Sequence, residues 1–332
     1  MKNDARIYVA GHRGLVGSTI VRRLQNSGYS NLIVRTRGEL DLADQSAVRR
    51  FFEDERPEYV FMAAARVGGI VANNSFPAEF IQQNLAIQLN VIDECWRSAV
   101  NRMIFLGSSC IYPRECPQPI KEEYLLTGPL EPTNRPYAVA KIAGIEQCWA
   151  YNRQYGTQYL AVMPTNLYGP GDHYDLSTSH VLPALIRKAH EAKVAGGKEL
   201  IVWGTGAPRR EFLYVDDMAD ACLFLANLSE PAFRSLVGSE SAAPLINVGY
   251  GSDLTIRELA ELIAHLVGFE GRVVFDASKP DGTPQKWLDS TRILRMGWKP
   301  STNFEEGIRK TYGDFVKFCA NDSSRIVESA AR

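Results

Sequence analysis

The chain has 332 residues, of which 45% are hydrophobic and 23% charged, and 37 basic residues nearly balance 38 acidic ones. This length exceeds what most single cores hold, so we expect two domains, or one large domain with a lobe. The formal net charge of −1 gives no electrostatic basis for binding nucleic acid or a membrane surface.

Targeting and cysteine patterns indicate the compartment. No apolar stretch reaches the length of a membrane span, and no signal peptide precedes the first predicted strand. The six cysteines are scattered and lack paired metal-ligand spacing. This usage is typical of a reducing compartment, so we expect a cytoplasmic protein without a metal site.

A glycine-rich turn near the N-terminus is the first chemical signal. A short apolar run over 6–10 ends in Gly11, Gly14 and Gly17, and an apolar helical pattern follows at once. Strand, glycine turn and helix in this order are typical of a dinucleotide-binding βαβ unit, whose helix start receives the phosphates. A glycine-rich turn without a ligand is the alternative.

The end of the second predicted strand indicates which nicotinamide cofactor is bound. NAD-binding units usually place an acidic residue here, whereas NADP-binding units place arginine against the 2′-phosphate. Arg35 and Arg37 alternate along the strand, so only one of them need face the ribose, and Arg13 can reach the same place. Because a guanidinium matches phosphate with paired donors, we predict NADP(H) held by Arg13 and Arg37, with Glu39 and Asp41 as acidic competitors.

Strands and helices alternate through the first half of the chain. Strands are predicted over 31–34, 59–63, 103–106 and 159–163, and helices within 41–54, from 77 through 96, and over about 137–155. This alternation predicts a Rossmann-type α/β fold, a doubly wound parallel sheet with helices on both faces.

The alternation breaks after about residue 170. Helices are predicted over 181–193, 215–228, 256–267 and 304–318, with strands over 200–203, 245–248 and 272–275. We therefore predict an NADP-binding Rossmann domain over 1–170, with later segments around 212–250 packing back on it. A smaller C-terminal α/β substrate-binding lobe would cover mainly 171–320, followed by a flexible tail over 321–332.

Three side chains form a candidate reductase site. Ser108 follows a predicted strand, and Tyr137 and Lys141 lie four residues apart, so they share one face of a helix. An ammonium beside a phenol favours the phenolate, and such a tyrosine can donate a proton to a carbonyl oxygen as a hydride reaches its carbon. Ser108 can hold the same oxygen. The alternative is an unrelated pair on a helix surface.

With these motifs the chain resembles the extended short-chain dehydrogenase/reductases that act on nucleotide sugars. More narrowly, it is similar to those that epimerise C3 and C5 of GDP-4-keto-6-deoxy-D-mannose and then reduce its C4 ketone with NADPH. The segments that carry this resemblance lie at 11–14, 67–70, 107–113, 164–170 and 279–283.

The resemblance implies a role for each matching residue. It implies a catalytic set of Ser108, Cys110, Tyr137, Lys141 and His180, in which Cys110 and His180 are the acid/base pair of the epimerisation. It implies substrate contacts at Lys188, Trp203, Arg210 and Asp281, with Arg187 as a rival to Lys188. It implies cofactor contacts at Gly11, His12, Arg13, Gly14, Leu15, Val16, Gly17, Arg37, Asp41, Leu42, Ala64, Leu106, Gly107, Ser108, Ser109, Lys141, Pro164, Thr165, Asn166, Leu167 and His180.

The chemistry of this acid/base pair agrees with epimerisation. Protons beside a ketone are acidified through an enolate, and inversion needs one group on each face of the carbon. A thiol and an imidazole, whose ordinary pKa values are about 8.5 and 6.5, can both exchange protons near neutrality. From the residues alone, each could equally be structural.

The resemblance also implies a homodimer joined through the helices around 77–100 and 134–155. Two other functions remain open. One is another nucleotide-sugar epimerase or dehydratase of the same fold, and the other is a non-enzymatic protein that senses NADP and regulates a partner.

Overall fold

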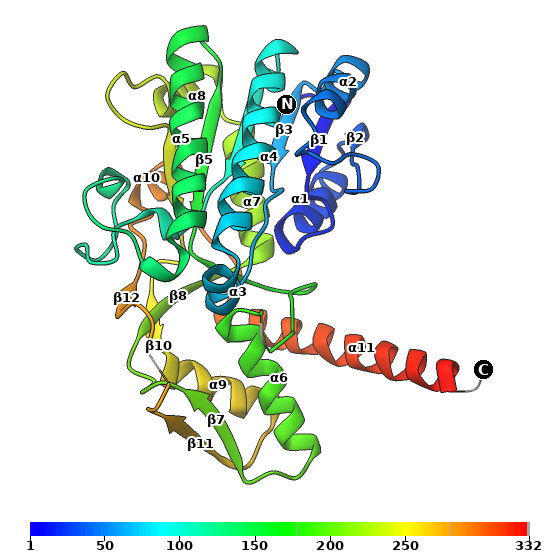
Figure 1. Cartoon of the computed structure of the whole chain (residues 1–332), viewed down its shortest axis with the longest axis vertical. Helices are drawn as coiled ribbons and strands as arrows, with labels where there is room; N and C mark the ends of the chain where they lie inside the picture. Colours follow the sequence, from blue (N-terminus) through cyan, green and yellow to red (C-terminus); the bar gives the residue numbers. More distant parts are fainter. Residues whose placement is uncertain (177, 280, 331–332) are drawn as a thin grey trace.

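A six-stranded parallel sheet forms the larger half of the molecule (Figure 1). The computed structural model describes residues 1–330 except 177 and 280, without the side chains of 70, 71 and 321–330. The sheet has the order β2 (Leu32–Ile33), β1 (Ile7–Ala10), β3 (Tyr59–Met62), β4 (Arg102–Leu106), β5 (Tyr159–Pro164) and β9 (Leu245–Val248). Each neighbouring pair in this order is parallel.

Helices cover both faces of this sheet, because its apolar strands must be buried on both sides. One face carries α2 (Gln45–Glu55), α4 (Pro77–Arg97) and α5 (Arg135–Tyr155). The other carries α1 (Leu15–Asn26), α7 (Val215–Ala226) and α8 (Glu230–Val237). This arrangement confirms the predicted Rossmann-type fold.

The glycine turn explains how α1 reaches its place. A Cβ on Gly17 would lie 2.1 Å from the carbonyl oxygen of Gly11, so α1 can pack this closely only on a bare backbone. Gly11 has a φ of +81°, and a Cβ there would lie 2.7 Å from the amide nitrogen of Ala64. Both glycines therefore have the structural roles that the sequence predicts.

The smaller lobe is built around short strands. Its larger sheet contains β10 (Asp253–Thr255), β8 (Arg209–Tyr214) and β12 (Gln285–Lys286), with β6 (Asn166–Tyr168) also paired to β8. A separate pair contains β7 (Glu199–Trp203) and β11 (Arg272–Asp276). The helices α6 (Val181–Val194), α9 (Ile256–Val267) and α11 (Phe304–Ala330) enclose a third core with these strands.

Short connecting elements complete the chain. They are α3 (Ile70–Ser75), α10 (Thr291–Arg295) and the 3₁₀ turns Ser109–Ile111, Glu122–Tyr124 and Pro132–Asn134. The helix predicted over 304–318 continues as helical backbone to Ala330. The flexibility predicted for 321–332 stays a prediction, and residues 331 and 332 lie outside the described residues. Within the described residues, none of the helices combines the length and apolar character needed to span a membrane.

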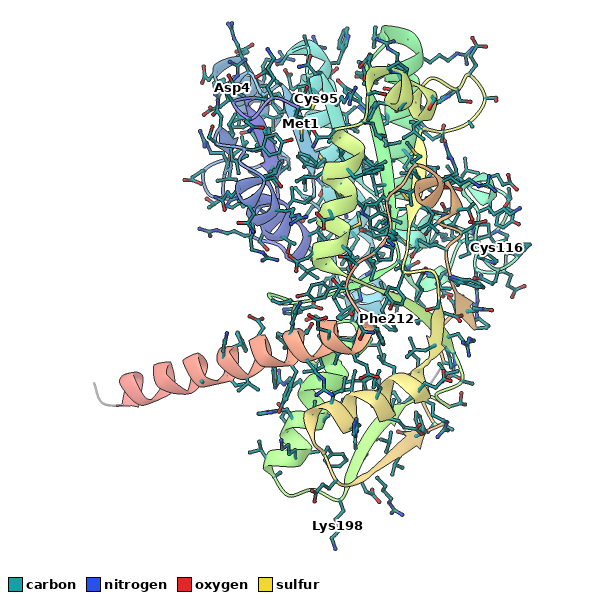
Figure 2. The ribbon with its side chains drawn as sticks, turned by 180° about the vertical axis from the view of Figure 1, so that it is seen from behind. Met1, Asp4, Cys95, Cys116, Lys198 and Phe212 are labelled. Atoms are coloured by element: carbon teal, nitrogen blue, oxygen red, sulfur yellow. The ribbon has the colours of Figure 1, made fainter. Side chains whose placement is uncertain are left out.

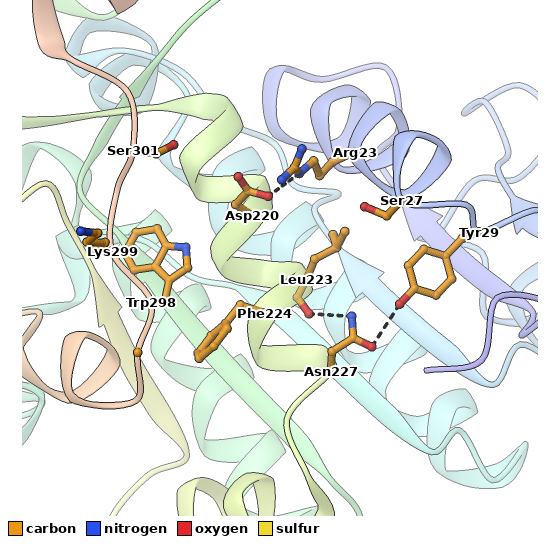
Figure 3. Close-up of a pocket in the computed structure, with 11 residues that line it drawn as sticks. Arg23, Ser27, Tyr29, Asp220, Leu223, Phe224, Asn227, Trp298, Lys299 and Ser301 are labelled. Atoms are coloured by element: carbon orange, nitrogen blue, oxygen red, sulfur yellow. Dashed lines mark hydrogen bonds and ion pairs between the residues drawn. The ribbon is translucent and has the colours of Figure 1, made fainter.

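A cavity of about 410 Å³ lies between α1, α7 and residues 297–301 (Figure 3). The ion pair of Arg23 with Asp220 and the side chain of Asn227 line it, together with Trp298. None of the site residues that the sequence predicts lines this cavity. The candidate site must therefore be sought at the carboxyl ends of the strands.

Candidate active site

The start of α1 forms a cradle for a diphosphate. Gly14 caps the helix without a side-chain hydrogen bond, and the first turn carries no acidic residue. A Cβ on Gly14 would meet only the carbonyl oxygen of Gly11, at 3.5 Å, so space lies in front of this backbone. The buried Nδ1 of His12 has no hydrogen-bond partner within the described residues. Unpartnered amides, the helix dipole and this open space together fit a dinucleotide.

Arginine surrounds the end of this cradle where the adenosine ribose would lie. Arg37 is 78% exposed and only 3.8 Å from Asp41, so its guanidinium can turn toward a ligand. Arg35 instead pairs with Glu55, donates to the carbonyl of Val34 and lies over the ring of Phe51. The two arginines therefore have different partners, but they do not alternate along a strand as predicted, because β2 ends at Ile33.

The acidic competitor Glu39 is engaged within its own turn. Its carboxylate accepts a 2.7 Å bond from the amide of Thr36, and this bond is the main cause of its lowered pKa. Arg13 and Arg35 lower the same pKa further, which places Arg13 beside this turn. The electrostatics here favour a phosphate over a bare ribose hydroxyl.

The other predicted cofactor residues follow the ends of neighbouring strands. Ala64 follows β3 and packs against Gly11, and Gly107 follows β4, where a Cβ would lie 2.0 Å from Met163 Cε. Thr165 follows β5, and its hydroxyl donates to the carbonyl of Glu211 at 2.9 Å. Parallel strands present these ends at one edge of the sheet, so the residues share a single crevice.

The predicted reductase residues form one buried cluster. Lys141 is 3% exposed, and its ammonium donates to the carbonyl of Leu106 at 2.7 Å, at the end of β4. Tyr137 lies one turn earlier on α5, 5.9 Å from the same ammonium across its ring, and edge-on to Phe80. The hydroxyl of Ser108 accepts from the amide of Cys110 at 3.4 Å, which starts the 3₁₀ turn.

Burial has a larger effect on the pKa of Tyr137 than the groups around it. It raises the pKa of the Tyr137 phenol well above its ordinary value, the Cys110 thiol raises it further, and the Ser108 hydroxyl lowers it. Burial also lowers the pKa of Lys141 to about 8. The predicted support of a phenolate by Lys141 is thus not observed in the free protein, because the ammonium is turned to the carbonyl of Leu106.

Of the predicted acid/base pair, Cys110 borders this cluster. Cys110 is 5% exposed, and burial raises the pKa of its thiol, whereas Lys286, Ser108 and Lys141 lower it. His180 is the residue before the first turn of α6, and its residue surface is exposed. Desolvation lowers the pKa of its imidazole, and His173 and Lys286 lower it further. Cys110 therefore borders the tyrosine, and Lys286 acts electrostatically on both Cys110 and His180.

One aromatic surface of the lobe matches a nucleotide base. Trp203 on β7 is 58% exposed, with the ammonium of Lys188 5.1 Å and that of Lys279 5.7 Å from its ring. Arg187 is engaged elsewhere, since it pairs with Glu191 at 2.7 Å and donates to the carbonyl of Tyr174. Of the two predicted rivals, Lys188 is the one beside the tryptophan.

A second group of predicted substrate residues lies on the neighbouring sheet. Burial lowers the pKa of Arg210 on β8, whereas Asp281 and Glu131 raise it. Asp281 accepts two bonds from Thr205, at 2.9 Å from its amide and 2.7 Å from its hydroxyl. The two predicted groups therefore line one face of the lobe.

The residue that sequence reasoning missed is Lys286. It belongs to a strand of two residues and carries no motif of its own. Its place beside Arg210 in the sheet could be found only from the pairing of β12 with β8. No cluster of three or more metal-ligating His, Cys, Asp or Glu side chains occurs among the residues whose structure is described.

Comparisons with known proteins agree with this geometry. The family described as "NAD dependent epimerase/dehydratase family" matches residues 7–234. The chain is 53% identical over 318 residues to "GDP-L-fucose synthase 1" of Arabidopsis thaliana, covering 96% of this chain and 95% of that protein.

Two solved structures extend the likeness to the fold. A GDP-6-OMe-4-keto-L-xylo-heptose reductase from C. jejuni has a TM-score of 0.90 and 37% identity, covering 96% of this chain and 99% of that one. A GDP-L-fucose synthetase from Naegleria fowleri bound to NADP has a TM-score of 0.83 and 28% identity, covering 96% and 95%.

Proposed function

Because the chain belongs to the NAD dependent epimerase/dehydratase family, we propose that it is a GDP-L-fucose synthase. It inverts C3 and C5 of GDP-4-keto-6-deoxy-D-mannose and then reduces the C4 ketone with NADPH, which yields GDP-L-fucose. The observation that carries the proposal is the convergence of a thiol, a phenol and a buried ammonium at the end of β4.

The epimerisation uses the flanks of the cluster. Cys110 and His180 exchange protons at the carbons beside the ketone, one from each face of the sugar. The protonated phenol of Tyr137 and the hydroxyl of Ser108 hold the ketone oxygen, where the negative charge of the enolate develops. The raised pKa of Tyr137 supports this role, because a protonated phenol can donate a hydrogen bond to an oxyanion.

The reduction uses the centre of the cluster. NADPH, when bound, supplies the hydride that reaches C4. Tyr137 donates its proton to the ketone oxygen, and Ser108 keeps that oxygen in place. Lys141 is anchored at Leu106, so it stands where it can bond the nicotinamide ribose and stabilise the phenolate that remains.

The chain's own residues determine which cofactor and nucleotide are held. Arg13 and Arg37 pair with the 2′-phosphate, since Arg35 is committed to Glu55. The NADP found in the Naegleria fowleri relative supports this choice. The guanine stacks on Trp203, and Lys188 and Arg210 contact the diphosphate. None of the cysteines forms a disulfide within the described residues, which supports a reducing, cytoplasmic location.

We further propose that two copies associate through α4 and α5. Leu89 and Val139 are exposed on these helices. A mostly apolar groove of about 300 Å³ lies between the helix starts, lined by Pro77, Ala78, Ile81, Arg135, Pro136 and Val139. Sedimentation should give a dimer mass for the wild type and a monomer mass for Val139→Arg, and a wild-type monomer would contradict the proposal.

The decisive experiment is product identification. Purified protein is incubated with GDP-4-keto-6-deoxy-D-mannose and NADPH in D₂O, and the sugar is analysed by NMR. We expect GDP-L-fucose with deuterium at C3 and C5. Reduction without deuterium at either carbon would indicate a simple 4-reductase, and absence of NADPH oxidation would indicate a sensor.

A further inference from the structure

Lys286 is held in the cleft by contacts on both sides of β12. On one side it pairs with Arg210 in the neighbouring parallel strand β8, so the two residues lie side by side in the sheet. On the other side Gln118 accepts from the amide of Trp287 at 3.0 Å and donates to the carbonyl of Gln285 at 3.4 Å. Lys286 therefore cannot be displaced without moving the loop that follows Cys110.

The same loop is attached to the strand at further points. The amide of Ile120 donates to the carbonyl of Trp287 at 2.7 Å, and the amide of Asp289 returns a 2.8 Å bond to the carbonyl of Ile120. The loop that follows Cys110 and the strand containing Lys286 are thus joined by several hydrogen bonds. These hydrogen bonds hold the backbone of Lys286 in place, which a charged group needs if it is to act at one position in a site.

The ammonium of Lys286 is not neutralised by a direct partner. Within the described part of the chain, its Nζ has neither an ion pair nor a hydrogen bond. Glu131 acts on both Lys286 and Arg210, and Asp281 acts on Arg210 more strongly than Glu131 does. An ammonium in a partly buried place without a direct counterion is costly unless the reaction brings negative charge to it.

Two separate anions could meet this charge. One is the substrate diphosphate, for which Arg210 is already placed. The other is the negative charge that forms on the thiol and on the sugar during epimerisation. Lys286 lowers the pKa of both the Cys110 thiol and the His180 imidazole, so its ammonium lies near both groups. Arg210 is not among the groups that shift the pKa of His180.

We propose that Lys286 is a catalytic residue of the epimerisation stage, whose ammonium faces the sugar between Cys110 and His180 and stabilises the anions formed there. The inference rests on the proposed function. It concerns the proton transfers of the epimerisation and not the later reduction, in which Tyr137 and Lys141 act.

The charges balance through this step. The Cys110 thiolate removes a proton from a carbon beside the ketone, so an S–H bond forms and the C–H electron pair moves into an enolate on the ketone oxygen. The His180 imidazolium then returns a proton to the other face of that carbon, and the electron pair of the enolate forms the new C–H bond. A cation beside both groups favours the thiolate and makes the imidazolium a stronger acid.

The remaining groups around the thiol do not replace Lys286. Ser108 and Tyr137 are uncharged, and Lys141, which donates to the carbonyl of Leu106, lowers the pKa of Cys110 less than Lys286 does. Among the influences that lower the pKa of Cys110, Lys286 is the largest, ahead of Ser108 and Lys141. The facing groups on α5, β12 and the 3₁₀ turn thus leave Lys286 as the main counterion.

The test compares Lys286→Met and Lys286→Arg with the wild type. Lys198→Met is the matched control, because Lys198 lies on the same lobe at its far tip (Figure 2). Three quantities are measured: deuterium incorporation at C3 and C5 without NADPH, the KM for the sugar nucleotide, and the pH dependence of Cys110 alkylation by iodoacetamide. NADPH binding and circular dichroism confirm that each variant is folded.

We expect Lys286→Met to lower deuterium incorporation at saturating substrate by about tenfold or more and to shift Cys110 alkylation upward by about one pH unit, since each unit changes the thiolate fraction tenfold. Lys286→Arg should recover most of both values, and Lys198→Met should match the wild type. A KM that rises while exchange at saturation is unchanged would make Lys286 a diphosphate ligand and overturn the proposal.

Three further outcomes are informative. Unchanged exchange and unchanged alkylation in Lys286→Met also overturn the proposal. If Lys286→Met fails to fold, Lys286→Arg decides: loss of exchange there, with the charge kept and the fold intact, contradicts the electrostatic role. If the wild type itself incorporates no deuterium, the proposed function fails first, whatever Lys286 does.

Discussion

The half with the six-stranded sheet and the smaller lobe position their candidate residues by different means. In the first half, the candidate cofactor groups and Ser108 follow strands of the parallel sheet, as Gly11 follows β1, and Tyr137 and Lys141 share one face of α5. In the lobe, the candidate residues come from α6, β7, β8 and the segment before β12, and only short strands join them. Local sequence therefore determines the candidate cofactor and reductase residues, whereas tertiary pairing determines how the candidate residues of the lobe come together.

We expect the largest loss of activity from removing the hydroxyl of Tyr137, in the first half. Tyr137→Phe removes the proton donor of the reduction, so NADPH oxidation should fall by about 10²–10⁴-fold, the usual contribution of a general acid. Deuterium should still enter at C3 and C5, because Cys110 and His180 remain. Tyr151→Phe, on the same helix but bonded to Asp93, is the control and should keep its activity. Equal rates in both variants would remove Tyr137 from the mechanism.

The second prediction concerns Cys110, which borders the reductase cluster. Cys110→Ser should lower deuterium incorporation by about 10²-fold or more, because a hydroxyl is a far weaker acid than a thiol near neutrality. NADPH affinity, measured by fluorescence titration, should not change. Cys116→Ser, in the neighbouring loop (Figure 2), should retain exchange. Wild-type exchange in Cys110→Ser would assign the proton transfer to another group.

A lobe substitution should affect binding more than chemistry. Arg210→Met should raise the KM for the sugar nucleotide by about tenfold to a hundredfold, as expected for losing a hydrogen bond to a charged group. The turnover number at saturation should change little. A large loss of turnover with an unchanged KM would show that the lobe takes part in the reaction itself and would break the comparison.

We expect a smaller effect from a substitution that changes the preference for NADPH over NADH. Arg37→Ser should reduce the preference for NADPH over NADH by about tenfold, since it removes one of the guanidinium partners of the 2′-phosphate. Arg35→Ser is the matched control, because Arg35 is held by Glu55 and should leave the preference unchanged. Measured kcat/KM ratios for the two cofactors distinguish these outcomes, and a shift only in Arg35→Ser would reverse the assignment.

The smallest effect concerns stability in the lobe. Burial raises the pKa of Asp172 to about 7, and its Oδ2 has no hydrogen-bond partner among the residues described. The folded protein therefore holds this proton more tightly than the unfolded chain, and its stabilising contribution is lost as the pH rises from about 4 to 7. Asp172→Asn should raise Tm at pH 8 by about 2–4 °C, with the two melting curves converging near pH 4. Equal differences at both pH values would contradict this explanation.

The comparison also explains what the sequence could predict. The glycine turn, the serine after β4 and the Tyr–Lys pair on α5 are local patterns, and the structure places them as the sequence implied. The helices α4, α5, α6 and α9 carry periodic apolar faces and were predicted within a few residues.

Three of the strands that the sequence did not predict share a physical cause. β6, β10 and β12 have two or three residues, too few to show a period, and they exist because β8 offers them hydrogen bonds. Lys286 is an ordinary lysine until that pairing places it beside Arg210. A counterion supplied from a distant strand leaves no local pattern in the chain.

The position of β9 has a consequence for dissection of the molecule. The chain leaves the first sheet after β5, builds part of the lobe, and returns to add β9 beside β5 before leaving again. A fragment that stops near residue 170 would expose the full edge of β5, and unpaired edges of this kind promote aggregation. Neither half should be obtainable as an independently folding piece, and limited proteolysis in the intervening loops should yield nicked chains that stay associated.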